Sequence, residues 1–224
     1  MIEKSILIDE LMGSWALWCG TDKEAAELAR VAEVIVRENL PIVSVVPSVV
    51  PIIWPWLEMV DVKIFARFYL PGRKVDEVSV SDVVQKINAA FKQGANGAQV
   101  FLSVSDLKKF VDFMYVIRDD LFFDKDFSIG FDLNDVGPFD WNEVYEDARK
   151  LNVNSLFFAF TKDMGNKSDF VGRIYAMLNA WNDDNKFELH FALGADSMRI
   201  EQVVRLVEGV QPQLRDRLKF FVNF

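Results

Sequence analysis

The chain has 224 residues, of which 51% are apolar and 26% charged, and its formal net charge is −9 at pH 7. This composition is typical of one soluble folded domain and excludes disordered, collagen-like and disulfide-stabilised classes. Because the acidic balance leaves no broad basic face, we expect neither a nucleic acid nor a membrane surface as a partner. The single cysteine, Cys19, and the absence of an export signal predict a reducing, cytoplasmic location.

Short apolar runs rich in Val, Ile and Phe alternate with helical patterns along the whole chain. Capping residues precede several of the helical patterns. Thr21 with Glu24 and Asp140 with Glu143 have capping-box spacing, and Gly94 is placed to end a helix as a left-handed cap. The repeating order of strand, loop, helix and tight return is typical of βα units. The apolar runs predict eight strands, which begin near Trp15, Ile42, Val62, Ala98, Phe127, Asn154, Phe187 and Leu218.

One stretch, residues 39–57, carries no charge and resembles a membrane span in hydropathy. It contains Pro41, Pro47, Pro51 and Pro55, and prolines at this density would break a spanning helix. We therefore interpret the stretch as a buried strand followed by a loop, with the aromatic segment 54–56 in that loop.

Eight βα units in a chain of this length resemble a compact (β/α)8 TIM barrel that spans residues 1–224 as a single domain. An open doubly wound parallel sheet is the alternative. In an open sheet helices cover both faces, so both alternating sets of strand residues would be apolar. Here one set is apolar and the other mixed. In FSIGFDLN, which begins at Phe127, every second residue is apolar, and the others are Ser, Gly, Asp and Asn. The pattern favours a barrel whose interior receives the mixed set.

The sequence also predicts a departure from a complete barrel. Phe224 directly follows the eighth predicted strand, so no eighth helix is expected over the gap between the first and last strands. Residues 1–13 carry apolar side chains at helix-like spacing, and we expect this segment to cap the barrel floor or to cover that gap. A homo-oligomer formed through the uncovered first and eighth strands is the alternative.

Candidate site residues follow from the fold, because barrel enzymes carry their sites at the C-terminal ends of the strands. Asp132 is a carboxylate in an otherwise apolar strand, which is costly to bury unless it is paired or used. His190 is the only histidine, and an imidazole titrates near pH 6.5, which suits proton transfer. These two are the candidate catalytic residues. Inward phase and position at a strand end select the candidate binding residues, which are Arg67, Tyr69, Ser103, Asn134, Thr161 and Asn223.

Arg67, Asp132 and His190 lie on the third, fifth and seventh predicted strands. Since alternate strands contribute to common layers of a barrel, we expect the three side chains to lie together. Asp132 could instead form a structural ion pair with Arg67, and His190 could be a packed, hydrogen-bonded imidazole. Glu188, two residues before His190, is expected to pair with Lys219.

Metal and cofactor chemistry have weaker sequence support. Asp132, Glu188 and His190 together could bind a divalent cation, but ligands from different barrel layers rarely converge, so this interpretation is not favoured. No cofactor is assigned. Lys162 follows the sixth strand out of phase, which leaves Schiff-base chemistry as a minority interpretation.

We expect an enzyme of the lyase or isomerase type that uses acid–base chemistry on a small anionic or polyhydroxylated metabolite in the barrel mouth. Arg67 would orient the anion, Asp132 and His190 would transfer protons, and the remaining candidates would supply hydrogen bonds. The alternative is a barrel without catalysis that serves ligand binding or oligomeric assembly.

Overall fold

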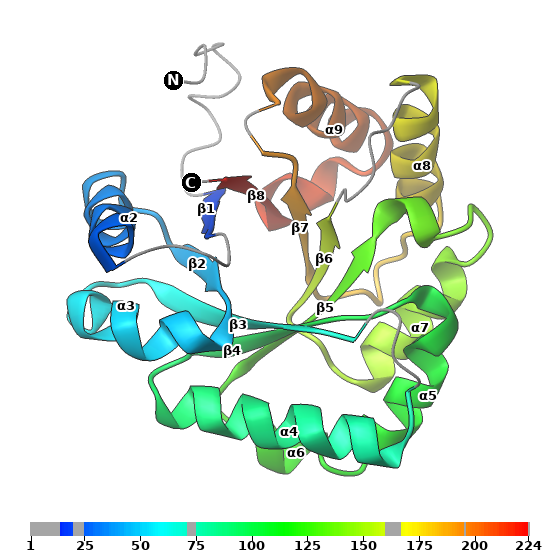
Figure 1. Cartoon of the computed structure of the whole chain (residues 1–224). Coiled ribbons are helices and arrows are strands. Elements are labelled where there is room, and N and C mark those ends of the chain that lie inside the picture. Colours follow the sequence, from blue (N-terminus) through cyan, green and yellow to red (C-terminus); the bar gives the residue numbers. More distant parts are fainter. Residues whose placement is uncertain (1–13, 20–24, 71–74, 160–166, 195, 224) are drawn as a thin grey trace.

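The computed structural model describes residues 14–19, 25–70, 75–159, 167–194 and 196–223. Its eight strands pair in parallel and in chain order to form a closed barrel (Figure 1). Pairing of the first strand with the last closes the ring, so the predicted TIM barrel is confirmed and an open sheet is wrong. Every predicted strand start lies within one residue of the observed one. The strands are β1 (Trp15–Trp18), β2 (Ile42–Val45), β3 (Lys63–Tyr69), β4 (Gly97–Phe101), β5 (Asp126–Asp132), β6 (Ser155–Ala159), β7 (Glu188–Ala192) and β8 (Leu218–Asn223).

Helices surround the barrel on its outer side (Figure 1). Gly94 ends one of them at φ 108°, as predicted. Asp140 precedes another, but its carboxylate accepts a hydrogen bond from the Gly137 amide and caps no helical amide, so the predicted capping box is wrong. Thr21 lies outside the described residues. The helices are α2 (Ala25–Arg37), α3 (Val50–Leu57), α4 (Glu77–Lys92), α5 (Val104–Met114), α6 (Arg118–Leu121), α7 (Trp141–Lys150), α8 (Lys167–Asn179) and α9 (Ser197–Val210), with short 3₁₀ turns η1 (Pro47–Val49), η2 (Leu133–Asp135) and η3 (Pro212–Arg217).

The proline-rich stretch after β2 is helical, which corrects the predicted loop. Pro51 lies in the first turn of α3, where a residue without an amide hydrogen loses no hydrogen bond. Trp54 and Trp56 therefore project from a helix, and Trp54 packs against Gly94 at the end of α4. In the part of the chain that the structure describes, no helix combines the length and hydropathy needed to cross a bilayer.

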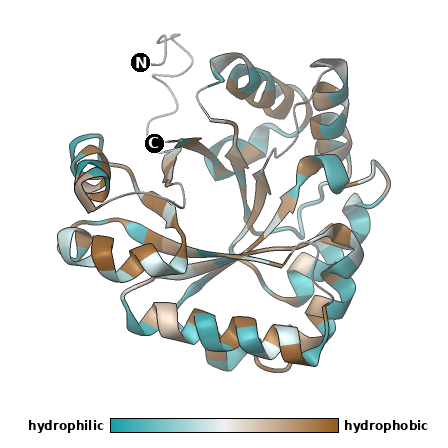
Figure 2. Cartoon of the chain, viewed as in Figure 1, coloured by the Kyte–Doolittle hydropathy of each residue, from teal (hydrophilic) through white to brown (hydrophobic). Residues whose placement is uncertain are grey.

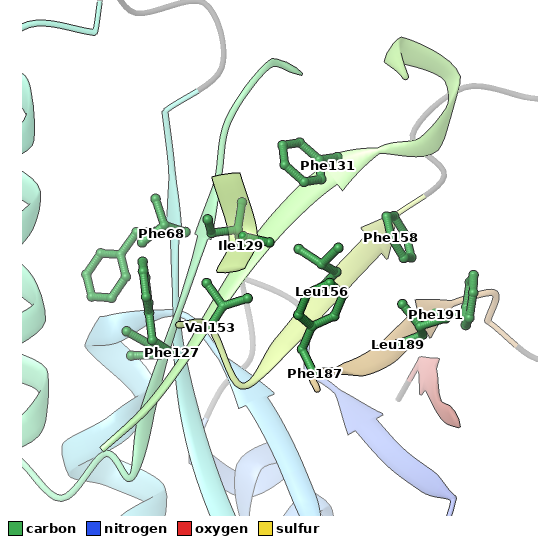
Figure 3. Packing of buried hydrophobic residues seen from close by; sticks show 14 of the residues in the cluster. Phe68, Phe127, Ile129, Phe131, Val153, Leu156, Phe158, Phe187, Leu189 and Phe191 are labelled. Atoms are coloured by element: carbon green, nitrogen blue, oxygen red, sulfur yellow. The ribbon is translucent and has the colours of Figure 1, made fainter. Parts of the chain in front are cut away.

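The main hydrophobic core lies between the strands and the helices. Phe127, Ile129 and Phe131 of β5 are buried there beside Leu156 and Phe158 of β6 (Figure 3). Figure 2 shows the apolar colour on the strands and the hydrophilic colour on much of the outer helix surface. Burying each such side chain contributes roughly 1.5 to 3 kcal/mol. The predicted apolar set therefore packs under the helices, and the mixed set is left to fill the barrel.

The barrel interior is built in layers contributed by alternate strands. The pairing register places the residues of these layers, and a strand residue two positions further along lies one odd-strand or even-strand layer higher. The central odd-strand layer contains Trp18, Arg67, Gly130 and Ala192, and the next odd-strand layer toward the floor contains Ala16, Phe65, Ser128 and His190. The even-strand layer between them contains Ser44, Gln99, Phe157 and Phe221.

The region outside β1 and β8 has no described helix that follows β8. In Figure 1, α2 lies beside β1 and β2, and α9 lies beside β7 and β8. Residues 1–13, which we expect to cap the floor or cover this region, lie outside the described residues. That role, the single-domain extent of 1–224 and the alternative homo-oligomer therefore stay predictions.

Candidate functional site

Arg67 lies at the centre of the barrel and is only 1% exposed. Its Nη1 donates to the Ser44 carbonyl at 2.9 Å and to the Ser44 hydroxyl at 3.3 Å, and its Nη2 donates to the Cys19 carbonyl. These acceptors are all neutral. Burial lowers the pKa of Arg67, and the nearby Tyr69 and Cys19 side chains oppose this effect. Among the described residues no carboxylate forms an ion pair with Arg67, so the alternative structural pair with Asp132 is not found.

Aromatic rings surround the Arg67 guanidinium. Its Cζ lies 3.8 Å from the ring centroid of Trp18, which is cation–π geometry. Trp18 in turn contacts Phe101 edge-on at 5.8 Å and Phe157 at 5.0 Å, measured between centroids. Gly130 makes room for this cluster, since a Cβ there would come within 2.6 Å of the Phe101 ring. The rings fix the position of the guanidinium below the barrel mouth.

Tyr69 ends β3 above Arg67 and is 48% exposed. Its ring stacks on Phe101 at 5.1 Å between centroids. Burial raises the pKa of Tyr69, and the Arg67 cation only partly offsets that effect. The phenol therefore stays protonated at neutral pH and can donate a hydrogen bond toward the mouth.

Asp132 ends β5 at the same odd-strand level as Tyr69, and it is half-buried. Its Oδ1 accepts a hydrogen bond from the Asn134 amide at 2.9 Å, which caps η2. The Asn134 side-chain nitrogen is buried and has no hydrogen-bond partner among the described residues. Tyr69, Asp132 and Asn134 thus lie at the ends of strands or just beyond them, as predicted.

The other candidates at this end of the barrel are more dispersed. Asn223 ends β8, is exposed, and lies close to Gly194. Ser103 occupies the N-cap position of α5, and its hydroxyl donates to the Asp106 carboxylate, so that helix start already uses it. Thr161 lies outside the residues that the structure describes, as does Lys162.

His190 points toward the opposite end of the barrel. It is 1% exposed, and its Nε2 lies 2.8 Å from Glu188 Oε2. Burial lowers the pKa of His190, against the effect of Glu188. Burial raises the pKa of Glu188. The hydrogen bond and electrostatic attraction of His190, together with the charges of Lys219 and Lys63, outweigh this effect, so the pKa of Glu188 is lowered overall. A neutral imidazole therefore donates from Nε2 to an ionised Glu188, and His190 Nδ1 is left without a partner in the described part of the chain.

The structure does not bring Asp132 and His190 together. Asp132 lies one odd-strand layer above Arg67, and His190 lies one layer below it, where Phe157 and Phe221 cover its ring. Two inward residues on odd-numbered strands therefore make contact only if they also lie at the same height along the barrel axis. The less favoured cation site fails for the same reason. No group of three possible metal ligands gathers among the described residues.

Sequence reasoning missed the partners of Arg67. Trp18, Ser44 and Gln99 all point into the barrel, and the Ser44 hydroxyl donates to the Gln99 side-chain oxygen. The first two strands are short, with both alternating sets largely apolar, so their inward phase could not be read. A single polar residue within an apolar strand, Ser44 in β2 and Gln99 in β4, was the available signal.

A closed eight-stranded barrel with polar side chains at its strand ends places the chain in the TIM-barrel class of α/β proteins. No family model and no curated protein sequence matches the chain. Solved structures match its fold. A protein from Toxoplasma gondii ME49, provisionally assigned as a deoxyribose-phosphate aldolase, superposes with a TM-score of 0.71 at 11% identity over 96% of this chain and 91% of that chain.

Two further structures show the same likeness. The deoxyribose phosphate aldolase from Aeropyrum pernix gives a TM-score of 0.68 at 9% identity, over 96% of this chain and 87% of that one. The provisionally named copper homeostasis protein CutC from Streptococcus agalactiae gives a TM-score of 0.63 at 9% identity, over 92% of this chain and 97% of that chain. At these identities the likeness establishes the fold alone.

Proposed function

We propose that the chain is a lyase or isomerase that acts on a small anionic metabolite at the C-terminal mouth of the barrel. Arg67 attracts and orients the anion, Asp132 transfers a proton, and Tyr69 donates a hydrogen bond. His190 has no part in this mouth site, because it hydrogen-bonds Glu188 below the aromatic layer.

The observation that carries the proposal is the buried charge of Arg67, with which no carboxylate among the described residues forms an ion pair. Its described hydrogen-bond partners are two backbone carbonyls, the Ser44 hydroxyl and the Tyr69 phenol, and these uncharged groups satisfy hydrogen bonds without cancelling the charge. A buried cation is costly unless something neutralises it, and in a low-dielectric barrel its field favours an anion nearby. The mouth above Tyr69 and Asp132 is where a ligand could approach that field.

Two side chains of suitable chemistry lie in that region, at the C-terminal ends of their strands. Asp132 is half-buried at the end of β5, and its Oδ1 caps η2. The Tyr69 phenol is held protonated beside the cation. A carboxylate base and a phenol donor at the same level of the barrel suit abstraction of a proton next to a carbonyl, a step that aldol cleavage and isomerisation share.

Structural neighbours add limited support. The names of two of them state aldolase activity on deoxyribose phosphate, which is lyase chemistry on a small anionic sugar. Since unrelated chemistries occur on this fold, the names favour the proposal only by analogy.

A thermal-shift screen of the full chain against sugar phosphates and small carboxylates tests the anion site. Ligand at about a hundred times its dissociation constant adds roughly 2.7 kcal/mol, which is about 5 to 10 °C for a chain of this size. We expect Arg67→Met to abolish the shift and Arg67→Lys to keep part of it.

Arg118→Met is the matched control. Arg118 also donates to two backbone carbonyls, those of Leu151 at 2.6 Å and Asn152 at 2.8 Å, but it lies away from the mouth. We expect this variant to keep the full shift. A ligand whose shift survives Arg67→Met would refute the proposed site.

The non-catalytic alternative predicts the same binding without turnover. Incubating the full chain with the ligand that gives the shift, and following product by NMR, separates the two. Binding that depends on Arg67 with no conversion would replace the enzyme proposal with a ligand-binding barrel.

A further inference from the structure

A cavity of about 430 Å³ opens at the floor of the barrel, the end opposite the mouth. Ionisable side chains from four strands and one connection line it: Asp61, Lys63, Asp126, Glu188, His190 and Lys219. TIM-barrel floors ordinarily serve stability, so a cavity lined by six ionisable side chains at this end calls for an explanation of its own.

The charges of the cavity are arranged as mixed pairs. Lys63 Nζ lies 2.6 Å from Asp126 Oδ2. Glu188 accepts from the neutral His190, and Lys219 is close enough to stabilise the Glu188 anion. With His190 neutral, the three carboxylates and two ammonium groups that line the cavity sum to a charge of −1.

Several of these groups remain available to a ligand. The Lys63 side chain is 57% exposed and the Glu188 side chain 40% exposed, so solvent reaches both. His190, by contrast, is almost fully buried, and its Nδ1 has no hydrogen-bond partner in the described chain. The imidazole thus keeps an unused acceptor, and its ring forms part of the cavity lining.

We propose that this floor cavity binds a small zwitterion that carries both an ammonium and a carboxylate group, as a free amino acid does. A simple anion would meet a carboxylate beside each lysine, and a simple cation would meet the lysines. A zwitterion places its carboxylate toward Lys63 and Lys219 and its ammonium toward Glu188 and Asp126. Its two charges therefore match the mixed pairs that neither single charge can match.

His190 gives a direct test because the chain has no other histidine. In the full chain labelled with ¹³C and ¹⁵N at histidine, the imidazole NMR signals report on the floor alone. We expect glycine and L-serine to shift these signals saturably at millimolar concentration. Acetate and methylammonium at equal ionic strength, which each carry one of the two charges, should bind at least about tenfold more weakly.

Variants on two sides of the cavity sharpen the test. Lys219→Met and Glu188→Gln should each weaken glycine binding by at least about tenfold. Lys86→Met is the control, since Lys86 pairs with Asp82 on the surface of α4. It should leave the titration unchanged, and so should Arg67→Met, which separates this cavity from the mouth site.

Three results would overturn the proposal. The first is the absence of a saturable shift with either amino acid. The second is binding of acetate or methylammonium that is as tight as the binding of glycine, or glycine binding by Lys219→Met that is as tight as that of the wild-type chain. The third is binding that appears only after residues 1–13 are deleted, which would assign the cavity to the chain's own N-terminal segment.

Discussion

The guanidinium of Arg67 lies over the indole ring of Trp18 in one layer of the barrel interior, with 3.8 Å between Cζ and the ring centroid. Arg67 belongs to β3 and Trp18 to β1, and the hydrogen bonds of Arg67 reach the Cys19 and Ser44 carbonyls beyond β1 and on β2. One side chain thus ties three strands at their C-terminal ends. The contact also fixes the position of the cation below the mouth.

Replacing Trp18 tests how much this contact contributes. We expect Trp18→Leu to lower the free energy of unfolding by about 2 to 4 kcal/mol, measured by urea denaturation. In a double-mutant cycle with Arg67→Met, the coupling energy should be about 1 to 2 kcal/mol. Lys125 lies 5.9 Å from the Phe91 centroid near the surface, so the matched cycle there should give a coupling near zero. Equal couplings in the two cycles would show that the buried contact has no special strength.

Asp132→Asn separates a catalytic carboxylate from a structural one. An amide oxygen can still accept from the Asn134 backbone, so the free energy of unfolding should change by less than about 1 kcal/mol. Turnover of the substrate found in the screen should fall by at least about a hundredfold, because the amide cannot take up a proton. Asp196→Asn makes the same change at the cap of α9 and should leave turnover intact. A loss of several kcal/mol in Asp132→Asn would instead identify a structural ion pair.

The sequence was sufficient to predict the barrel because strand alternation depends only on which side of the sheet each residue faces. In β5, Phe127 and Ile129 had to face the helices, so Ser128 and Gly130 had to face inward. The α3 helix was missed because its prolines suggest a loop. Pro51 lies in the first turn, where it costs no hydrogen bond, whereas Pro55 lies inside the helix, and a composition count does not reveal that the helix contains both.

The site was harder to predict than the fold. Arg67, Asp132 and His190 were all correctly assigned to the inward set, but the shear of the barrel puts them at three different heights. Shear follows from strand pairing register, and no local sequence pattern encodes it. The pairing of His190 with Glu188 was equally inaccessible, because residues two apart on a strand contact each other only when both side chains lean the same way.

Gly94 gives a test of a cap that the sequence did predict. Its φ of 108° disfavours any side chain, and a Cβ would lie 2.2 Å from the Trp54 ring. Gly94→Ala should therefore lower the free energy of unfolding by about 2 to 4 kcal/mol. Gly172→Ala, in the exposed interior of α8 with nothing within 4 Å, should raise it by about 0.5 to 1 kcal/mol. Urea denaturation of both variants would contradict this account if the two changes had the same sign.

His190 should make stability depend on pH in a defined window. Burial lowers its pKa below the ordinary value of 6.5, so the unfolded chain binds a proton more readily than the native one. The contribution of His190 is therefore fully present above pH 6.5 and is lost as pH falls toward the lower native pKa. Glu188, whose pKa is also lowered, loses its contribution only below its ordinary value of 4.5, so the pH dependence just below pH 6.5 comes from His190 and not from Glu188.

Comparing the wild-type chain with His190→Gln isolates this effect. The glutamine amide can still donate to Glu188 but does not titrate, so the variant should lack the part of the pH dependence that lies just below pH 6.5. Urea denaturation at several pH values measures that difference, and the NMR titration of the single imidazole should give a midpoint below 6.5. A midpoint above 6.5 would mean that His190 is charged in the native barrel. The Glu188 contact would then be an ion pair, and stability would increase as the pH falls through this window.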